Sequence, residues 1–391
     1  WDAITDPFMG YIADNTSTRW GKFRPYILFG SIPALLAIIL CFTTPDLSST
    51  GKFYWALFTY ISFTTLYTIM AIPFGSMTAA MTQDMKERTS LASFRYIGGS
   101  SGSVVVASLT LPLVSLFTSP QLGFPIVVAC FAALAAIFCF LCFLNTKEIY
   151  SKVYEERIGL KKIINMLANN FALQFIVVAL LGTWIANNVK QVTVIYFIKY
   201  NLQLEPYFGL ILLGVILQIM LGALVANLIK DMFEKKIIFI IGTILYVVTD
   251  LIIYFITGYD NFWLFAFVGS FGFIGFGMAG VATWSMLADT VEFGEWKSGF
   301  RSEGVINSSF VCIFKLSIGF SGWLAGVILE YTNYQANAIS QNPETLEGLF
   351  IMGYIFPAVA GTIAMLIMAF HRYDSSFYDT VFSDLRSERK S

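Results

Sequence analysis

Two aspartates at the start of the chain, Asp2 and Asp6, are the residues best placed to do chemistry. They are four residues apart, so a helix places both carboxylates on one face. If this segment reaches the membrane surface near Asp14, a rise of about 1.5 Å per residue places Asp6 roughly 12 Å and Asp2 roughly 18 Å deep. A carboxylate there is costly unless a cation, a proton or a basic partner offsets its desolvation. The pair therefore predicts a cation site, with a structural ion pair as the alternative.

The composition identifies the environment in which these acids lie. The chain has 391 residues, of which 57% are hydrophobic and only 13% charged, and its mean hydropathy is +0.71. These values lie outside the range of soluble domains and indicate a polytopic membrane protein. A net charge of −1 gives no basic footprint for nucleic acid. The five cysteines all lie in apolar stretches, which argues against a disulfide framework and a zinc site.

Eleven apolar segments follow one another along the chain, and all but the first are long enough to span a bilayer. They cover residues 1–14, 25–44, 53–80, 92–117, 123–144, 171–198, 206–229, 237–257, 262–288, 302–330 and 346–371. The chain opens on Trp1, inside an apolar segment and with no signal region before it. We interpret it as a fragment that lacks the first helix and the start of the second.

The basic residues of the connections indicate the orientation in the membrane. Nearly all of them lie in alternate connections, on one side, whereas Lys52 and Lys199 are the only two on the other side. The richer side is predicted to be cytoplasmic, together with the C-terminal tail.

The longest connection, 145–170, falls after five segments with six still to come. This placement predicts an all-α protein with an incomplete helix bundle at 1–144, a cytoplasmic linker at 145–170, a second bundle at 171–372 and a cytoplasmic tail at 373–391. A short internal repeat supports duplication of a six-helix unit. The recurring residues are Phe94-Arg95 as Phe300-Arg301, and Met81 with Asp84 as Met286 with Asp289.

Charge inside apolar helices is the main chemistry that the chain offers. The sequence has no phosphate-binding GxxxxGK[ST] motif, no cluster of metal ligands, and no nucleophile with a plausible His partner. Lys315 lies deep in its segment, so with Asp2 and Asp6 it would make an exchangeable triad. Na⁺ would use both carboxylates and a hydroxyl such as that of Thr68, whereas H⁺ needs one carboxylate. The sequence leaves the choice of ion open.

A polar stripe at helical spacing runs through the sixth segment, with Thr183, Asn187, Lys190 and Gln191. Amides and a lysine suit sugar hydroxyls, and Lys190 would also suit a carboxylate or sulfonate on a substrate. The alternative is that Lys190 pairs with Asp250. Two tryptophans, Trp184 and Trp284, are candidates to stack on a sugar ring, although packing accounts for most membrane tryptophans.

Charged residues recur at the cytoplasmic ends of the predicted helices, with acids matching the bases. Salt bridges among them would latch the cytoplasmic ends together in one conformation and release them in another. The residues of this predicted gate are Asp14, Arg19, Arg24, Asp84, Arg88, Asp289, Glu292 and Arg301.

Several motifs along essentially the whole chain resemble the glycoside-pentoside-hexuronide:cation symporter family of the major facilitator superfamily. They are WDAxxDPxxG at 1–10, RWGKFRP at 19–25, the stretch from Tyr67 to Phe74, Phe94-Arg95, and ADTVEFGE at 288–295. The first two together are highly specific for the family.

The resemblance implies a major facilitator superfamily fold of twelve helices in two bundles, with alternating access to a site near the midplane. It implies that Asp2, Asp6 and Thr68 match the family's cation site, that Lys315 matches its membrane-embedded lysine, and that Arg95 matches its sugar-contacting arginine. The helix absent from this chain would carry a sugar-binding aspartate in melibiose-type members.

The chain departs from melibiose-type members around its Ile-Pro-Phe turn. Ala71 and Gly75 stand where those members have an acid and a tryptophan. The stretches 74–77 and 81–84 look more like the glucuronide and pentoside branch. This likeness favours an anionic or pentose-containing glycoside, with Lys190 as a candidate for the anion.

The sequence thus predicts a monomeric secondary transporter of the bacterial inner membrane that couples Na⁺ or H⁺ to sugar or glycoside uptake. Its partners are the sugar, the coupling ion and the bilayer, and no cofactor or structural metal is expected. The predicted substrate-binding residues are Arg95, Lys190, Asn187, Gln191 and Trp284. The alternatives are a lipid or drug carrier on the same fold, favoured by a long apolar cleft, and a membrane enzyme acting on lipid-linked sugar.

Overall fold

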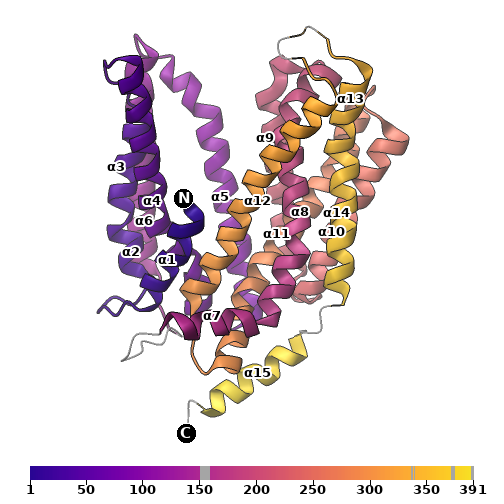
Figure 1. Cartoon of the computed structure of the whole chain (residues 1–391). Coiled ribbons are helices and arrows are strands. Elements are labelled where there is room, and N and C mark those ends of the chain that lie inside the picture. The colour runs from indigo at the N-terminus through magenta and orange to yellow at the C-terminus, as the bar shows by residue number, and fades with distance from the viewer. Residues whose placement is uncertain (150–158, 336–337, 339, 371–374, 389–391) are drawn as a thin grey trace. The chain divides into compact units, whose positions relative to one another are not determined.

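The computed structural model describes residues 1–149, 159–335, 338, 340–370 and 375–388, and all secondary structure within them is helical (Figure 1). Ten helical stretches among these residues are long and apolar enough to cross a membrane. They correspond one by one to the ten spanning segments expected from the sequence, so that prediction is confirmed. The predicted linker residues 150–158 and the tail residues 373–374 and 389–391 lie outside the described residues.

The chain divides into two compact units, each of which is described by itself. Unit 1 comprises Trp1–Asp84, Gly102–Asn170 and Ala288–Cys312, and unit 2 comprises Met85–Ser101, Phe171–Leu287 and Ile313–Ser391. The two internal boundaries after Asp84 and Leu287 adjoin the repeat-related aspartates Asp84 and Asp289. Of the repeated residues, Phe94-Arg95 therefore belongs to unit 2 and Phe300-Arg301 to unit 1.

Unit 1 contains the helices of the first half. They are α1 (Asp2–Asp14), α2 (Arg24–Phe29), α3 (Ser31–Cys41), α4 (Ser49–Met81), the end of α5 (Met85–Val114), α6 (Pro120–Asn145) and α7 (Leu160–Asn169). The end of α11 (Phe262–Ser298) and the start of α12 (Glu303–Tyr331) complete the unit. Its core is a cluster of Met9, Ala13, Phe23, Ile27, Ile72, Met77 and Ala80, which fixes α1 and α2 against α4.

Unit 2 contains the helices of the second half. They are the start of α5, α8 (Phe171–Tyr196), α9 (Phe208–Ile229), α10 (Lys235–Ile252), most of α11 and α12, α13 (Pro343–Phe350), α14 (Phe356–Ala369) and α15 (Ser375–Glu388). Short π-helical turns extend three of them at Phe197–Asn201, Ile253–Thr257 and Ile351–Ile355, and a 3₁₀ turn covers Glu205–Tyr207. The ring of Phe197 in the first π turn lies 5.7 Å from that of Tyr354 in the third, so these two turns meet in an aromatic core.

A glycine crossing brings the backbones of α1 and α12 together in unit 1. A Cβ on Gly304 would lie 2.6 Å from the carbonyl oxygen of Gly10, and one on Gly10 would lie 2.2 Å from the hydroxyl of Ser308. Backbone atoms cannot move aside as a side chain can, so only glycine fits at Gly304. This crossing sets the position of the acids of α1 against the start of α12.

We expect Gly304→Ala to lower the thermal unfolding midpoint of the purified protein by several degrees, because the added methyl overpacks the crossing at a cost of roughly 1–3 kcal/mol. Gly322→Ala is the matched control, since a Cβ there meets no atom within 4 Å. Thermal unfolding in detergent measures both variants. Equal midpoints for the two variants would contradict the assignment of a tight crossing.

Candidate functional site

The first candidate site is formed by the two acids of α1 with a hydroxyl of α4. The exposed fractions of Asp6 and Thr68 are 0% and 1%. The Thr68 hydroxyl donates a 2.9 Å hydrogen bond to Asp6 Oδ1. Asp2 lies one helical turn earlier and is half-buried. The structure thus brings Asp6 and Thr68 of the predicted cation site together within unit 1, as a carboxylate and a hydroxyl that supply oxygen ligands.

The turn of α4 beside this site differs from the melibiose-type pattern for a structural reason. Pro73 lies inside α4, and the Asn307 amide donates a 3.1 Å hydrogen bond to the carbonyl of Ile72. A Cβ on Gly75 would lie 2.5 Å from that amide nitrogen. A tryptophan at this position would therefore displace Asn307, so the glycine allows α12 to approach α4.

Lys315, the third member of the predicted triad, belongs to unit 2, whereas Asp2 and Asp6 belong to unit 1. Lys315 is half-buried on α12. Its association with the two acids stays a prediction.

At its other end, α1 caps the N-terminus of α12. The Asp14 carboxylate accepts hydrogen bonds from the Ser302 hydroxyl at 2.6 Å and from the backbone N–H groups of Gly304 and Val305 at 2.9 and 2.8 Å. These N–H groups have no partner within their own helix, and the helix dipole favours a negative charge there. Asp14 thus acts as a cap supplied by a helix distant in sequence.

A buried charge network continues from Asp14 in unit 1. Lys22 Nζ lies 3.7 Å from Asp14 and 3.4 Å from Glu303. The Arg301 guanidinium contacts Glu303, bonds Glu292 at 2.9 Å and Glu295 at 3.0 Å, and donates to the carbonyl of Ala79 at 2.8 Å. Every ionic side chain in this network is 0–2% exposed.

Arg301 holds together the carboxylates that surround it. Burial alone lowers the pKa of the guanidinium, but Glu292, Glu303 and Glu295 together raise that pKa above its ordinary value. Arg301 therefore stays charged at every physiological pH. Asp14, Glu292 and Arg301 of the predicted gate meet in this network, whereas Lys22 and Glu303, which link them, were not among the predicted site residues.

The loop before α2 is held by a second carboxylate cap. Glu148 accepts hydrogen bonds from the backbone N–H groups of Lys22, Phe23 and Arg24 at 2.8, 2.9 and 3.0 Å. The Arg24 side chain donates to the carbonyl of Phe143 at 3.2 Å. The predicted gate residue Arg24 is therefore bound within the first half of the chain.

The remaining predicted gate residues take separate positions. Arg19 is exposed and stacks on Trp20 at 4.2 Å. Asp84 is exposed at the end of the first chain segment of unit 1, and Asp289 is buried in the same unit. Arg88 is fully buried in unit 2. Their participation in one latch stays a prediction.

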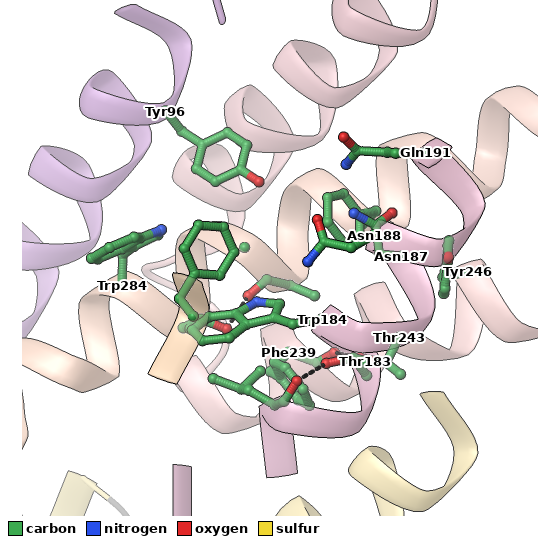
Figure 2. A pocket seen from close by; sticks show the side chains of 16 residues that line it. Tyr96, Thr183, Trp184, Asn187, Asn188, Gln191, Phe239, Thr243, Tyr246 and Trp284 are labelled. Atoms are coloured by element: carbon green, nitrogen blue, oxygen red, sulfur yellow. Dashed lines mark hydrogen bonds between the residues drawn. The ribbon is translucent and has the colours of Figure 1, made fainter. Parts of the chain in front are cut away.

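The second candidate site is a polar cavity of about 160 Å³ inside unit 2. In Figure 2 the amide residues of α8 lie on one side of the view, and Tyr96 and Trp284 lie on the other. The full lining is Tyr96, Leu180, Thr183, Trp184, Asn187, Asn188, Gln191, Phe239, Thr243, Tyr246, Phe276, Ala279, Gly280, Thr283, Trp284 and Phe314. None of these lining residues is Asp, Glu, Lys or Arg.

The predicted substrate-binding residues divide between this cavity and its surroundings. Asn187, Gln191 and Trp284 line it, as does Trp184, whose ring meets Phe314 at 4.7 Å. The Arg95 guanidinium lies 4.4 Å from the Trp284 ring, but Arg95 is not among the lining residues. Three residues of the predicted stripe, Thr183, Asn187 and Gln191, thus line one cavity with Trp284, and their role in sugar binding stays a prediction.

Lys190 takes the alternative that the sequence left open. Its ammonium lies 2.7 Å from Asp250. The side chains of Lys190 and Asp250 are 11% and 2% exposed. Lys190 does not line the polar cavity but a second, largely apolar one of about 720 Å³ in unit 2, together with Asp250 and Tyr354. Because the Lys190 ammonium already forms an ion pair with Asp250, the prediction that Lys190 binds an anionic substrate is not supported.

The ten long apolar helices among the described residues define an integral membrane protein. The family model described as MFS/sugar transport protein matches residues 1–375, and the chain belongs to that family. This confirms the family resemblance drawn from the sequence. The family transports small-molecule sugars, so the protein is a transporter and the membrane-enzyme alternative is excluded.

Individual proteins agree with this assignment. A symporter of Bacillus subtilis, YjmB, is 35% identical over 376 residues, which cover 94% of this chain and 80% of that protein. The isoprimeverose transporter of Lactiplantibacillus pentosus is 30% identical over 379 residues, or 95% of this chain and 78% of that one. The solved proton:xylose symporter XylE has a TM-score of 0.68 at 14% identity, covering 96% of this chain and 85% of XylE. The likeness to XylE supports the fold.

Proposed function

We propose that this protein is a symporter that couples the inward movement of Na⁺ or H⁺ to the uptake of a sugar or glycoside. The observation that carries the proposal is the buried Asp6 carboxylate, which accepts a hydrogen bond from Thr68 on a neighbouring membrane helix. A carboxylate buried there is favoured when a cation or proton neutralises it. The symporters and the isoprimeverose transporter among its relatives support the same function.

The polar cavity of unit 2 supplies the sugar-binding part of this proposal. Amides from α8 provide both donors and acceptors for hydroxyl groups, and Trp184 and Trp284 provide ring faces for the C–H faces of a sugar. If an ion at Asp6 stabilises the conformation that binds sugar, then sugar raises the affinity for the ion by the same factor. Alternating access then makes the ion gradient drive sugar uptake across the bacterial inner membrane.

Transport by the purified protein in lipid vesicles tests the proposal. We expect labelled xylose, glucose or their methyl glycosides to accumulate when a Na⁺ gradient or a pH gradient is imposed, and the accumulation to vanish when an ionophore dissipates that gradient. Counterflow without a gradient controls for intact sugar binding. Equilibration of sugar without accumulation under both gradients would refute symport.

A second candidate function is transport of a lipid or drug, and the apolar cavity of about 720 Å³ in unit 2 is the observation in its favour. Tetraphenylphosphonium, a hydrophobic cation, separates the two functions in the same vesicles. Its gradient-driven movement, with sugars having no effect, would favour the second function.

A further inference from the structure

Two buried polar atoms of the polar cavity in unit 2 have no hydrogen-bond partner among the described residues. They are the amide nitrogen of Asn188 and the hydroxyl of Tyr246. Both residues line the cavity, and Tyr246 is only 4% exposed. Buried donors and acceptors are nearly always hydrogen-bonded in folded proteins. We therefore expect a bound ligand to supply the hydrogen-bond partners of these two atoms.

The polar groups of the lining match an uncharged ligand that is rich in hydroxyls. Amides and hydroxyls provide both donors and acceptors, as sugar hydroxyls require. They belong to Asn187, Asn188, Gln191, Thr183, Thr243, Thr283, Tyr96 and Tyr246. A carboxylate or sulfonate in the same place would meet no cationic side chain from the lining.

A lysine lies directly behind this lining, but its charge is neutralised. Lys190 Nζ is 5.0 Å from the centre of the Tyr246 ring, while Asp250 bonds it at 2.7 Å. Asp250 follows Tyr246 by one turn of α10. The ammonium also lies 4.5 Å from the ring of Tyr354, and aromatic faces stabilise a cation. Without Asp250, the lysine would therefore lack this carboxylate partner beside the cavity.

We propose that Asn188 and Tyr246 bind hydroxyl groups of a neutral sugar, and that Asp250, by pairing with Lys190, keeps that lysine from attracting anionic sugars to the cavity. This inference rests on the proposed function, because it names the substrate class of the same cavity. It opposes the anionic glycoside that the sequence favoured. Asn188 and Tyr246 are binding residues, whereas Asp250 is a positioning residue that acts through Lys190.

Sugar binding to the purified full-length protein tests this inference without requiring ion coupling. Titration calorimetry at pH 6 compares xylose, glucose and galactose with glucuronate and galacturonate, which differ from the two hexoses at C6. We expect wild-type protein to bind one neutral sugar at least about tenfold more tightly than the uronates. Tyr246→Phe removes one hydroxyl and should weaken that binding by about five- to tenfold, with no change in thermal midpoint.

The charge-pair variants separate selectivity from sugar affinity. Asp250→Asn removes the carboxylate that pairs with Lys190, and we expect it to narrow the preference for the neutral sugar over its uronate by about tenfold. Lys190→Met/Asp250→Leu removes both charges and should restore the wild-type preference. This double variant keeps the test decisive if Asp250→Asn unfolds, because an uncharged pair should then remain selective for the neutral sugar.

The outcomes that overturn the inference differ from those that overturn the proposed function. Tighter binding of a uronate by wild-type protein, unchanged affinity in Tyr246→Phe, or loss of selectivity in the folded double variant would each refute the inference while leaving sugar transport in place. Absence of binding by every sugar tested would refute both.

Discussion

Asp6→Asn should abolish sugar accumulation against a gradient while leaving sugar counterflow in place. The amide keeps the size of the side chain and the Thr68 hydrogen bond but removes the charge that a cation or proton would neutralise. Transport then loses its driving ion rather than its sugar site. The ratio of internal to external labelled sugar, measured in vesicles under the imposed gradient, should fall to about one.

The control for this variant is Asp260→Asn, because Asp260 is an exposed acid. It should accumulate sugar as the wild type does. Asp2→Asn should lose accumulation as well, since Asp2 lies one turn from Asp6 on the same helix. Full accumulation by Asp6→Asn would reject its role in coupling.

Arg301→Gln should destabilise the protein more than any surface charge change, because it leaves Glu292, Glu295 and Glu303 buried together without their counter-charge. Breaking a buried ion pair by removing one partner costs about 3–5 kcal/mol. We expect a lower thermal midpoint and a lower yield of folded protein in detergent. Differential scanning fluorimetry and size-exclusion chromatography measure the two effects.

Lys86→Gln is the matched control, because its pair with Asp231 is well exposed, at 62% and 60%. An exposed pair of this kind contributes little to stability, so the midpoint should hardly move. If both variants unfold at the wild-type temperature, the Arg301 network does not stabilise the fold.

The helices could be predicted from the sequence because hydropathy reports directly on the length of chain that a bilayer requires. The association of Asp6 with Thr68 was implied by family resemblance rather than by spacing, since the two residues lie on separate helices. No periodicity within one helix indicates which neighbour it meets. That information resides in crossings such as that of Gly10 with Gly304.

The charged and polar site residues show the same limit. In the sequence, Lys22 is one of many basic residues of the predicted cytoplasmic side, and Glu303 lies near the start of an apolar segment. In the structure, Lys22 is buried beside Asp14, and Glu303 is buried beside Arg301. Asn188 follows Asn187 of the predicted stripe, and this position next to a polar residue could have indicated that Asn188 lines the same site. Tyr246 had no such signal, because an aromatic residue in an apolar helix is indistinguishable from packing.

The cap that Asp14 provides for α12 has a consequence for movement. The backbone N–H groups of Gly304 and Val305 have no acceptor within α12 and bond to Asp14 instead. Separating α12 from α1 would therefore expose both N–H groups, the Ser302 hydroxyl and the Asp14 carboxylate together. Hydration can satisfy all four groups at a helix terminus near the bilayer boundary, as it could not in the hydrocarbon interior. Parting the two helices at this end would thus exchange hydrogen bonds within the protein for hydrogen bonds to water, which lowers the free-energy cost of the movement.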